Sequence, residues 1–113
     1  MEPCIFCAIG KKESPATIEY DDDDVVAFWD ADPKAKVHIL IVPKKHIPSV
    51  TELKEEDAPL MGKMIWVAKQ LADKKNIAED GYRLTINAGK HSGQMVDHIH
   101  LHLMGGGPMG TMV

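Results

Sequence analysis

Histidine alternates with an aliphatic residue along the segment His98–Leu103 of this 113-residue chain. Side chains of a β-strand alternate between its two faces, so His98, His100 and His102 are expected to line one face, about 6–7 Å apart. A neutral imidazole near pH 7 is a nucleophile, a hydrogen-bonding group and a metal ligand. The pattern predicts a chemical site, with a solvated strand face and a three-histidine metal site as alternatives. One straight strand spreads three ligands too far apart to close on a single ion, which disfavours the metal site.

A glycine-bearing loop, Asn87–Gln94, runs into this segment, and the glycines Gly105–Gly107 follow it. Backbone N–H groups of such a loop can face a bound anion. Most loops of this composition are only turns, but next to three histidines the loop predicts a phosphate cradle. Of the other histidines, His38 is expected to be a partly buried strand residue and His91 an exposed loop residue.

A CxxC pair, Cys4 and Cys7, lies near the start of the chain. Two cysteines cannot form a disulfide framework, and their spacing fits a metal site, a redox pair or two small buried side chains. The pattern of a thioredoxin-like βαβ unit does not follow, which disfavours redox chemistry. The residues alone leave the metal and free-thiol interpretations open.

Composition limits the class of protein. Hydrophobic residues make up 44% and charged residues 27% of the chain, which is typical of a folded globular protein, and we expect one domain over residues 1–113. The net charge of -4 disfavours broad binding to a nucleic-acid backbone. Apolar runs are far shorter than about 18 residues, so we expect no membrane span. The first residues lack the features of a signal peptide, and a cytoplasmic protein is expected.

The elements that must position these residues are five strands and two helices. A short helix is predicted over Cys4–Ile9, ended by Gly10, and a long one from about Glu55 to Lys75. The run Asp21–Asp24 is expected at an exposed hairpin tip. The predicted strands are Ala16–Tyr20, Val25–Trp29, Val37–Val42, Tyr82–Asn87 and His98–Met104.

The long helix should bury one apolar stripe, because its apolar residues recur at i, i+3, i+4 and i+7. The predicted stripe consists of Leu60, Met61, Met64, Ile65, Ala68, Leu71 and Ala72. Hairpins dominate the order of elements. The sequence therefore predicts an α+β fold, with a mostly antiparallel five-stranded sheet and the long helix packed on it.

The alternating histidines followed by glycines resemble the signature of the histidine-triad (HIT) superfamily, and the third histidine resembles its Hint branch. The resemblance covers nearly the whole chain. It extends to Cys4–Cys7, Asp23–Asp30, His38–His46 and Asn87–Gln94. It implies a HIT-like fold and a two-fold homodimer in which paired strands form one continuous sheet.

The resemblance also implies an activity: hydrolysis of nucleotides through a covalent nucleotidyl-histidine, most directly as a purine nucleoside phosphoramidase. It implies that His100 attacks the α-phosphorus while its other ring nitrogen donates to the carbonyl of His98. His102 would hydrogen-bond the phosphate oxygens. Further residues are implied to hold the nucleotide: Asn87, Gly93, Gln94 and Met95 at the phosphate, Asp30 at the ribose hydroxyls, and Phe6, Phe28 and Trp29 near the base.

Some bacterial relatives hold structural zinc with two such cysteines and two histidines. The resemblance therefore implies a zinc site made by Cys4, Cys7, His46 and His98. Four such ligands close a tetrahedron and leave no position for water, so the metal is expected to stabilise the fold, with none needed for catalysis.

Two residues depart from the resemblance. Met95 lies where many Hint relatives carry a hydroxyl that meets the leaving group, and Asp97 lies where an aromatic residue or histidine is more usual. The alternatives to a phosphoramidase are a dinucleoside polyphosphate hydrolase of the Fhit type and a nucleotide-binding scaffold protein.

Overall fold

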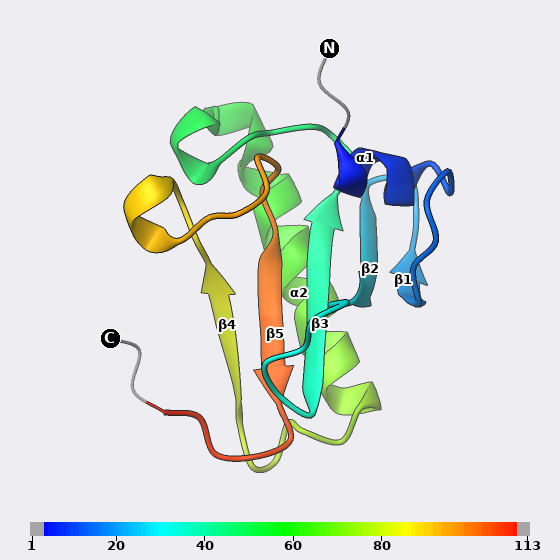
Figure 1. The fold of residues 1–113 in the computed structure, drawn as a ribbon, viewed down its shortest axis with the longest axis vertical. Coiled ribbons are helices and arrows are strands. Elements are labelled where there is room, and N and C mark those ends of the chain that lie inside the picture. The colour runs from blue at the N-terminus through cyan, green and yellow to red at the C-terminus, as the bar shows by residue number, and fades with distance from the viewer. Residues whose placement is uncertain (1–3, 111–113) are drawn as a thin grey trace.

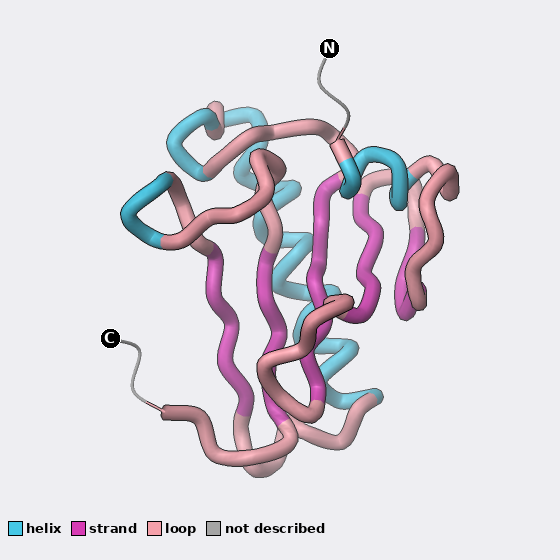
Figure 2. Tube along the Cα trace, in the orientation of Figure 1, coloured by secondary structure: helices cyan, strands magenta, loops and turns pink. Residues whose placement is uncertain are grey.

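The computed structural model describes residues 4–110 and confirms the α+β fold (Figures 1 and 2). One sheet of five antiparallel strands has the order β1-β2-β3-β5-β4. The long helix α2 crosses behind this sheet in the view of Figure 1. The helices and strands are α1 Ile5–Gly10, β1 Ile18–Asp21, β2 Val25–Trp29, β3 Val37–Pro43, α2 Ala58–Lys74, β4 Tyr82–Ile86 and β5 Leu101–Gly105.

The two faces of the sheet bury different clusters. Alternate strand residues such as Ile39, Ile41 and Leu103 pack with the buried stripe of α2 in the larger core. The opposite face carries a smaller cluster, in which Phe6 of α1 packs on β2 and β3. The sheet is therefore covered by α2 on one face, while α1 covers only part of the other face and leaves room there for a site.

Helix α2 begins three residues later than the sequence predicts. Residues Glu55–Asp57 form a turn of 3₁₀ helix, in which the Asp57 carboxylate accepts a hydrogen bond from the Lys54 backbone N–H at 3.0 Å. The buried stripe is Met64, Val67, Ala68, Leu71 and Ala72, so the prediction for Ile65 is wrong and that side chain is 52% exposed. None of the helices within residues 4–110 is long and apolar enough to cross a membrane.

The strand predicted over His98–Met104 begins only at Leu101. The last ladder pair between β3 and β5 joins Ile41 to Leu101. Further along β3 lies Pro43, which has no N–H to donate and therefore ends the ladder. The backbone N–H of Ile99 donates instead to the carbonyl of Ile47 at 2.7 Å. Two of the three alternating histidines thus lie before the strand, and the first of them, His98, lies in a bend where its N–H donates to the Val96 oxygen at 2.8 Å.

Candidate active site

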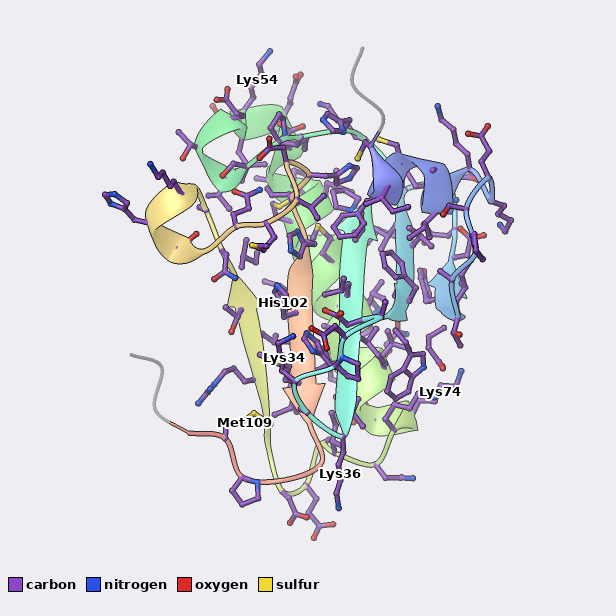
Figure 3. All side chains as sticks on the ribbon, viewed as in Figure 1. Lys34, Lys36, Lys54, Lys74, His102 and Met109 are labelled. Carbon is purple, nitrogen blue, oxygen red and sulfur yellow. The ribbon has the colours of Figure 1, made fainter. Side chains whose placement is uncertain are left out.

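A pocket of about 870 Å³ lies on the face of the sheet opposite α2. Its walls come from α1, the turn after β2, the loop before β5 and the pocket-facing residues of the strands. His100 and His102 line it together with Asp30, Asn87 and Gly93. Figure 3 shows the side chain of His102 on this face, near Lys34 of the turn between β2 and β3. The structure thus brings together candidates from five separate parts of the sequence.

His100 is held with one ring nitrogen free. Its Nδ1 lies 2.8 Å from the backbone oxygen of His98, and because a carbonyl only accepts, Nδ1 must carry the proton. In the neutral imidazole Nε2 then has a free lone pair. The ring is buried and lies against the edge of Phe6, with a centroid separation of 5.0 Å. This geometry gives a fixed imidazole with a nucleophilic atom in the pocket.

His102 is held in the opposite tautomer by a chain of hydrogen bonds. The backbone N–H of Lys34 donates to Nδ1 of His38 at 2.9 Å, so the neutral His38 carries its proton on Nε2. That Nε2–H donates to Nδ1 of His102 at 2.9 Å, which leaves the His102 proton on Nε2. Within residues 4–110 this buried Nε2 has no hydrogen-bond partner. His102 therefore offers the pocket an N–H donor.

Burial favours the neutral form of His102 and of His38. Burial, together with the nearby positive charge that His100 and His38 can carry, lowers the pKa of His102 to about 4. Burial also lowers the pKa of His38, although the carboxylate of Asp30, with Oδ2 at 3.4 Å from Nε2, acts in the other direction. Near pH 7 His102 is thus a neutral hydrogen-bond donor and not an acid.

Sequence reasoning missed the contribution of His38. It is only 2% exposed and lies on β3 between the turn after β2 and His102. The signal that could have identified His38 is its position along β3, because alternate residues of a strand face the same side of the sheet. His38 and Leu40 share one face of β3, and Leu40 pairs with His102 on β5. A histidine two positions from that pair lies diagonally across from His102.

The loop before β5 forms one wall of the pocket. Gly93 and Met95 line it, and Gly93 has a φ of +87°, a backbone conformation that favours glycine. The side chain of Gln94 is used inside the loop: its oxygen accepts from the Gly89 N–H at 2.8 Å and its nitrogen donates to the Pro48 oxygen at 2.6 Å. Met95 is 90% exposed.

The residues predicted near the base divide between the two faces of the sheet. Phe6 and Phe28 meet edge to face in the pocket wall, with centroids 5.5 Å apart. Trp29 touches the pocket rim, but its ring packs on the α2 side, where its Nε1–H donates to Glu19 at 2.7 Å. The Trp29 ring thus lies on the face opposite the Phe28 ring, because consecutive strand residues point to opposite faces.

His98 faces a second cluster instead of the pocket. Its Nε2–H donates to the Pro43 oxygen at 2.7 Å, so Nδ1 presents a lone pair. That Nδ1 lies 3.3 Å from the Cys4 sulfur, 3.6 Å from the Cys7 sulfur and 3.1 Å from Nδ1 of His46. The three alternating histidines therefore do not converge on one ion, which excludes the three-histidine metal site.

The four atoms of this second cluster fit a tetrahedral ion. They lie within 4.8 Å of one another, and the separations above resemble the edges of about 3.3–3.8 Å that Zn–N and Zn–S bond lengths require. The hydrogen bond from His98 to Pro43 orients that ring as outer partners of metal ligands do. Burial and the neighbouring Cys4 sulfur raise the pKa of Cys7. A bound cation would favour the thiolate form of this residue. This Cys/His group can hold a metal.

Two exposed residues stay outside the pocket wall. Asp97, next to the buried His98, is exposed, and so is His91 in the loop. Neither has a hydrogen bond or ion pair to the pocket histidines among the described residues. Neither residue therefore contributes a contact to the pocket histidines.

Known proteins are similar to this chain in sequence and fold. Residues 3–111 match the family described as "scavenger mRNA decapping enzyme C-term binding". The purine nucleoside phosphoramidase of Escherichia coli (strain K12) is 48% identical over 112 residues, which cover 99% of this chain and 94% of that protein. The fold superposes on a HIT family hydrolase from Legionella pneumophila Philadelphia 1 with a TM-score of 0.94, at 42% identity and 96% coverage of both chains.

A zinc-bound histidine triad family protein from Mycobacterium smegmatis is also similar, with a TM-score of 0.79 and 32% identity over 90% of this chain and 73% of that one. The fold and the histidine pocket thus have the form of a histidine-triad protein. The chain belongs to the histidine-triad superfamily.

Proposed function

We propose that this protein is a purine nucleoside phosphoramidase, which cleaves the P–N bond between a nucleoside monophosphate and an amine. The observation that carries the proposal is the pair of opposite tautomers, a free lone pair on His100 and a free N–H on His102, in one pocket. The identity of 48% to a phosphoramidase over nearly the whole chain supports the same activity.

The first step forms a covalent nucleotidyl-histidine. Nε2 of His100 attacks the α-phosphorus with its lone pair, while the Nδ1–H stays bonded to the His98 oxygen. The P–N bond to the amine breaks, and the amine leaves with its electron pair and takes a proton from water. The Nε2–H of His102 stabilises the charge that grows on the phosphoryl oxygens.

The second step releases the product. A water molecule attacks the phosphorus, the bond to Nε2 of His100 breaks and its electron pair returns to the ring. The proton of the water passes to solvent, so neutral His100 and a nucleoside monophosphate remain. Both steps use imidazoles alone.

The rest of the pocket accounts for recognition of the nucleotide. Asp30 would accept from the ribose hydroxyls, and Phe6 and Phe28 would contact the base by shape. Asn87 and the backbone of Gly93–Met95, with Gln94 holding the loop in place, would surround the phosphate. The base is therefore selected loosely and the ribose firmly.

The test is His100→Ala. Removal of a covalent nucleophile costs several orders of magnitude in rate, so we expect turnover to be lost and binding of a nucleoside monophosphate to remain. A panel of purine phosphoramidates, dinucleoside polyphosphates and nucleotidyl sulfates gives the substrate class. Near-normal turnover by His100→Ala would contradict the mechanism, and a preference for dinucleoside polyphosphates would contradict the substrate.

We further propose that Cys4, Cys7, His46 and His98 bind a structural zinc ion. The support is the fit of the four ligand atoms to a tetrahedron and the similarity to a zinc-bound member of the superfamily. Zinc would hold the start of α1 to the segments after β3 and before β5. It takes no part in the chemical steps above.

The protein is also proposed to act in the cytoplasm as a two-fold homodimer. Within residues 4–110 β4 is an edge strand, and it would pair with its counterpart in the second copy and extend the sheet. The exposed Ile65 on α2 is an apolar side chain that such an interface would cover. Two copies joined there would form one continuous sheet of ten strands.

A further inference from the structure

A row of residues crosses the pocket floor from β2 to β4. Phe28 pairs with Leu40, Leu40 pairs with His102, and His102 pairs with Thr85. All four residues line the pocket. Neighbouring strands lie about 4.8 Å apart, so the row spans about 14 Å.

This row gives an order, from β2 to β4, in which the parts of a bound substrate can lie along the pocket. The proposed function places the base at Phe28, the ribose at Asp30 after β2, and the phosphorus at His100 and His102. The amine is bonded to the phosphorus and forms the end of the substrate beyond it, so a substrate that lies along this row has its amine on the side away from the nucleoside. On that side the next strand is β4, and its pocket-lining side chain is Thr85.

Thr85 has a hydroxyl that the fold itself does not use. Its Oγ1 is buried and, within the described chain, makes no hydrogen bond. Burying an unpaired hydroxyl costs about 1–3 kcal/mol, so such groups usually meet a ligand or a water. The other unpaired buried atom in the same wall is Nε2 of His102, directly across the ladder.

We propose that Thr85 forms the polar contact of a leaving-group subsite, in which Oγ1 accepts a hydrogen bond from the N–H of the scissile amine. This inference rests on the proposed function. It also accounts for the methionine at position 95, because the hydroxyl that many Hint relatives place on that loop would here come from β4. Met95 is 90% exposed and its thioether is only a weak acceptor.

The experiment compares two substrates: an adenosine 5′-phosphoramidate of a primary alkylamine, which has an N–H, and its N-methyl counterpart, which has none. Thr85→Val removes the hydroxyl at nearly constant volume, and Thr85→Ser keeps it. We expect Thr85→Val to lower kcat/KM about tenfold for the N–H substrate and to leave the N-methyl substrate within about twofold. Thr85→Ser should stay near the wild type for both.

Ser49→Ala is the matched control, because Ser49 Oγ is also buried and unpaired but does not line the pocket. It should leave the ratio between the two substrates unchanged. An unchanged ratio in Thr85→Val would overturn the proposal. So would a lower molecular mass of Thr85→Val in light scattering with the ratio intact, since the hydroxyl would then serve assembly of the dimer.

A binding measurement separates this inference from the proposed function. In the His100→Ala background, calorimetry measures the affinity for the intact N–H amidate without turnover. Addition of Thr85→Val should weaken that affinity about tenfold and leave the affinity for adenosine monophosphate unchanged. If the wild type cleaves neither amidate but this loss is seen, the subsite stands and the proposed activity fails. If both amidates are cleaved and this loss is missing, the subsite fails.

Discussion

Each of three imidazoles in this protein has a role set by what its second nitrogen binds. A carbonyl acceptor on Nδ1 leaves His100 with a free Nε2 lone pair. A donor on Nδ1 leaves His102 with a free N–H, and a carbonyl acceptor on Nε2 leaves His98 with a lone pair for the cysteine cluster. The same side chain thus acts as nucleophile, donor or ligand through the direction of one hydrogen bond.

The Asp30 carboxylate should make the pocket selective for ribose. Charge-assisted hydrogen bonds contribute about 1.5–3 kcal/mol each, so we expect adenosine monophosphate to bind at least about tenfold more tightly than its 2′-deoxy form. Asp30→Ala should bind the two equally. Calorimetric titration of both nucleotides measures this, and equal affinities in the wild type would remove Asp30 from that role.

For single residues, the sequence predicts the alternating histidines of the site but not the residues that hydrogen-bond to them. The spacing of His100 and His102 is local information, and the structure places both in the pocket. His38 joins them only through the register of β3 against β5, which no single segment encodes. The sequence places Phe28 and Trp29 together, but consecutive strand residues point to opposite faces, so the Phe28 ring lies on the pocket face and the Trp29 ring on the α2 face.

Among the elements, α1 shows how tertiary contacts can stabilise a short helix. It has six residues, and Cys4 at its N-cap accepts a hydrogen bond from the Cys7 N–H at 3.4 Å. Isolated helices of this length are not stable in water, so its tertiary contacts must hold it. Those contacts are Phe6 and Ile9 in the smaller core and the cysteines in the Cys/His group.

Replacing both Cys4 and Cys7 by serine should therefore lower the melting temperature, by at least about 5 °C. Most of the turnover should remain in molecules that are still folded. Elemental analysis should find up to one zinc per chain in the wild type and none in the variant. A chelator should lower the melting temperature of the wild type only. If mild chelation stopped turnover while the fold stayed intact, the ion would have to be catalytic.

The sequence predicts all five strands and both helices, with errors only at their ends. Periodicity identifies an element, but its boundary depends on what lies beside it. The histidine strand starts late because Pro43 on the neighbouring strand cannot continue the ladder. Helix α2 starts late because Asp57 is drawn into a 3₁₀ turn by its bonds to Lys54 and Lys45.

For the whole molecule, an exposed apolar side chain on α2 and an edge strand of the sheet predict assembly. Ile65 is 52% exposed on α2, and β4 is an edge strand in residues 4–110. Light scattering at micromolar concentration should give about twice the chain mass of 12.5 kDa. Ile65→Lys should weaken the association, and Glu13→Lys, at an exposed position between α1 and β1, serves as a charge control. A monomeric mass for the wild type would refute the dimer.

Acid should destabilise the fold through its buried histidines. The pKa of His102 is about 4 in the folded protein, against about 6.5 in an unfolded chain. Between these values the unfolded state binds more protons, so this contribution to the free energy of unfolding is complete above pH 6.5 and is lost as the pH falls toward 4. The lowered pKa values of His38 and His98 act in the same direction.

Urea unfolding at several pH values from 7 to 4 measures this loss. His102→Asn should show a shallower decrease in stability than the wild type. His91→Asn, an equivalent change at an exposed position, should keep the steep one. Identical slopes for all three proteins would contradict the assignment to His102.

The hydrogen bonds from Lys34 through His38 to His102 all run one way. Because a backbone amide starts the chain, neither ring can reverse its tautomer without stranding that N–H, at a cost of about 1–3 kcal/mol. The last donor of this series, the Nε2–H of His102, therefore selects its partner. It binds a ligand atom that offers a lone pair and disfavours a ligand atom that offers a proton. Any oxygen of a fully ionised phosphoryl group can accept from this N–H, however the group is rotated. A protonated phosphoryl group must direct its hydroxyl proton away from His102.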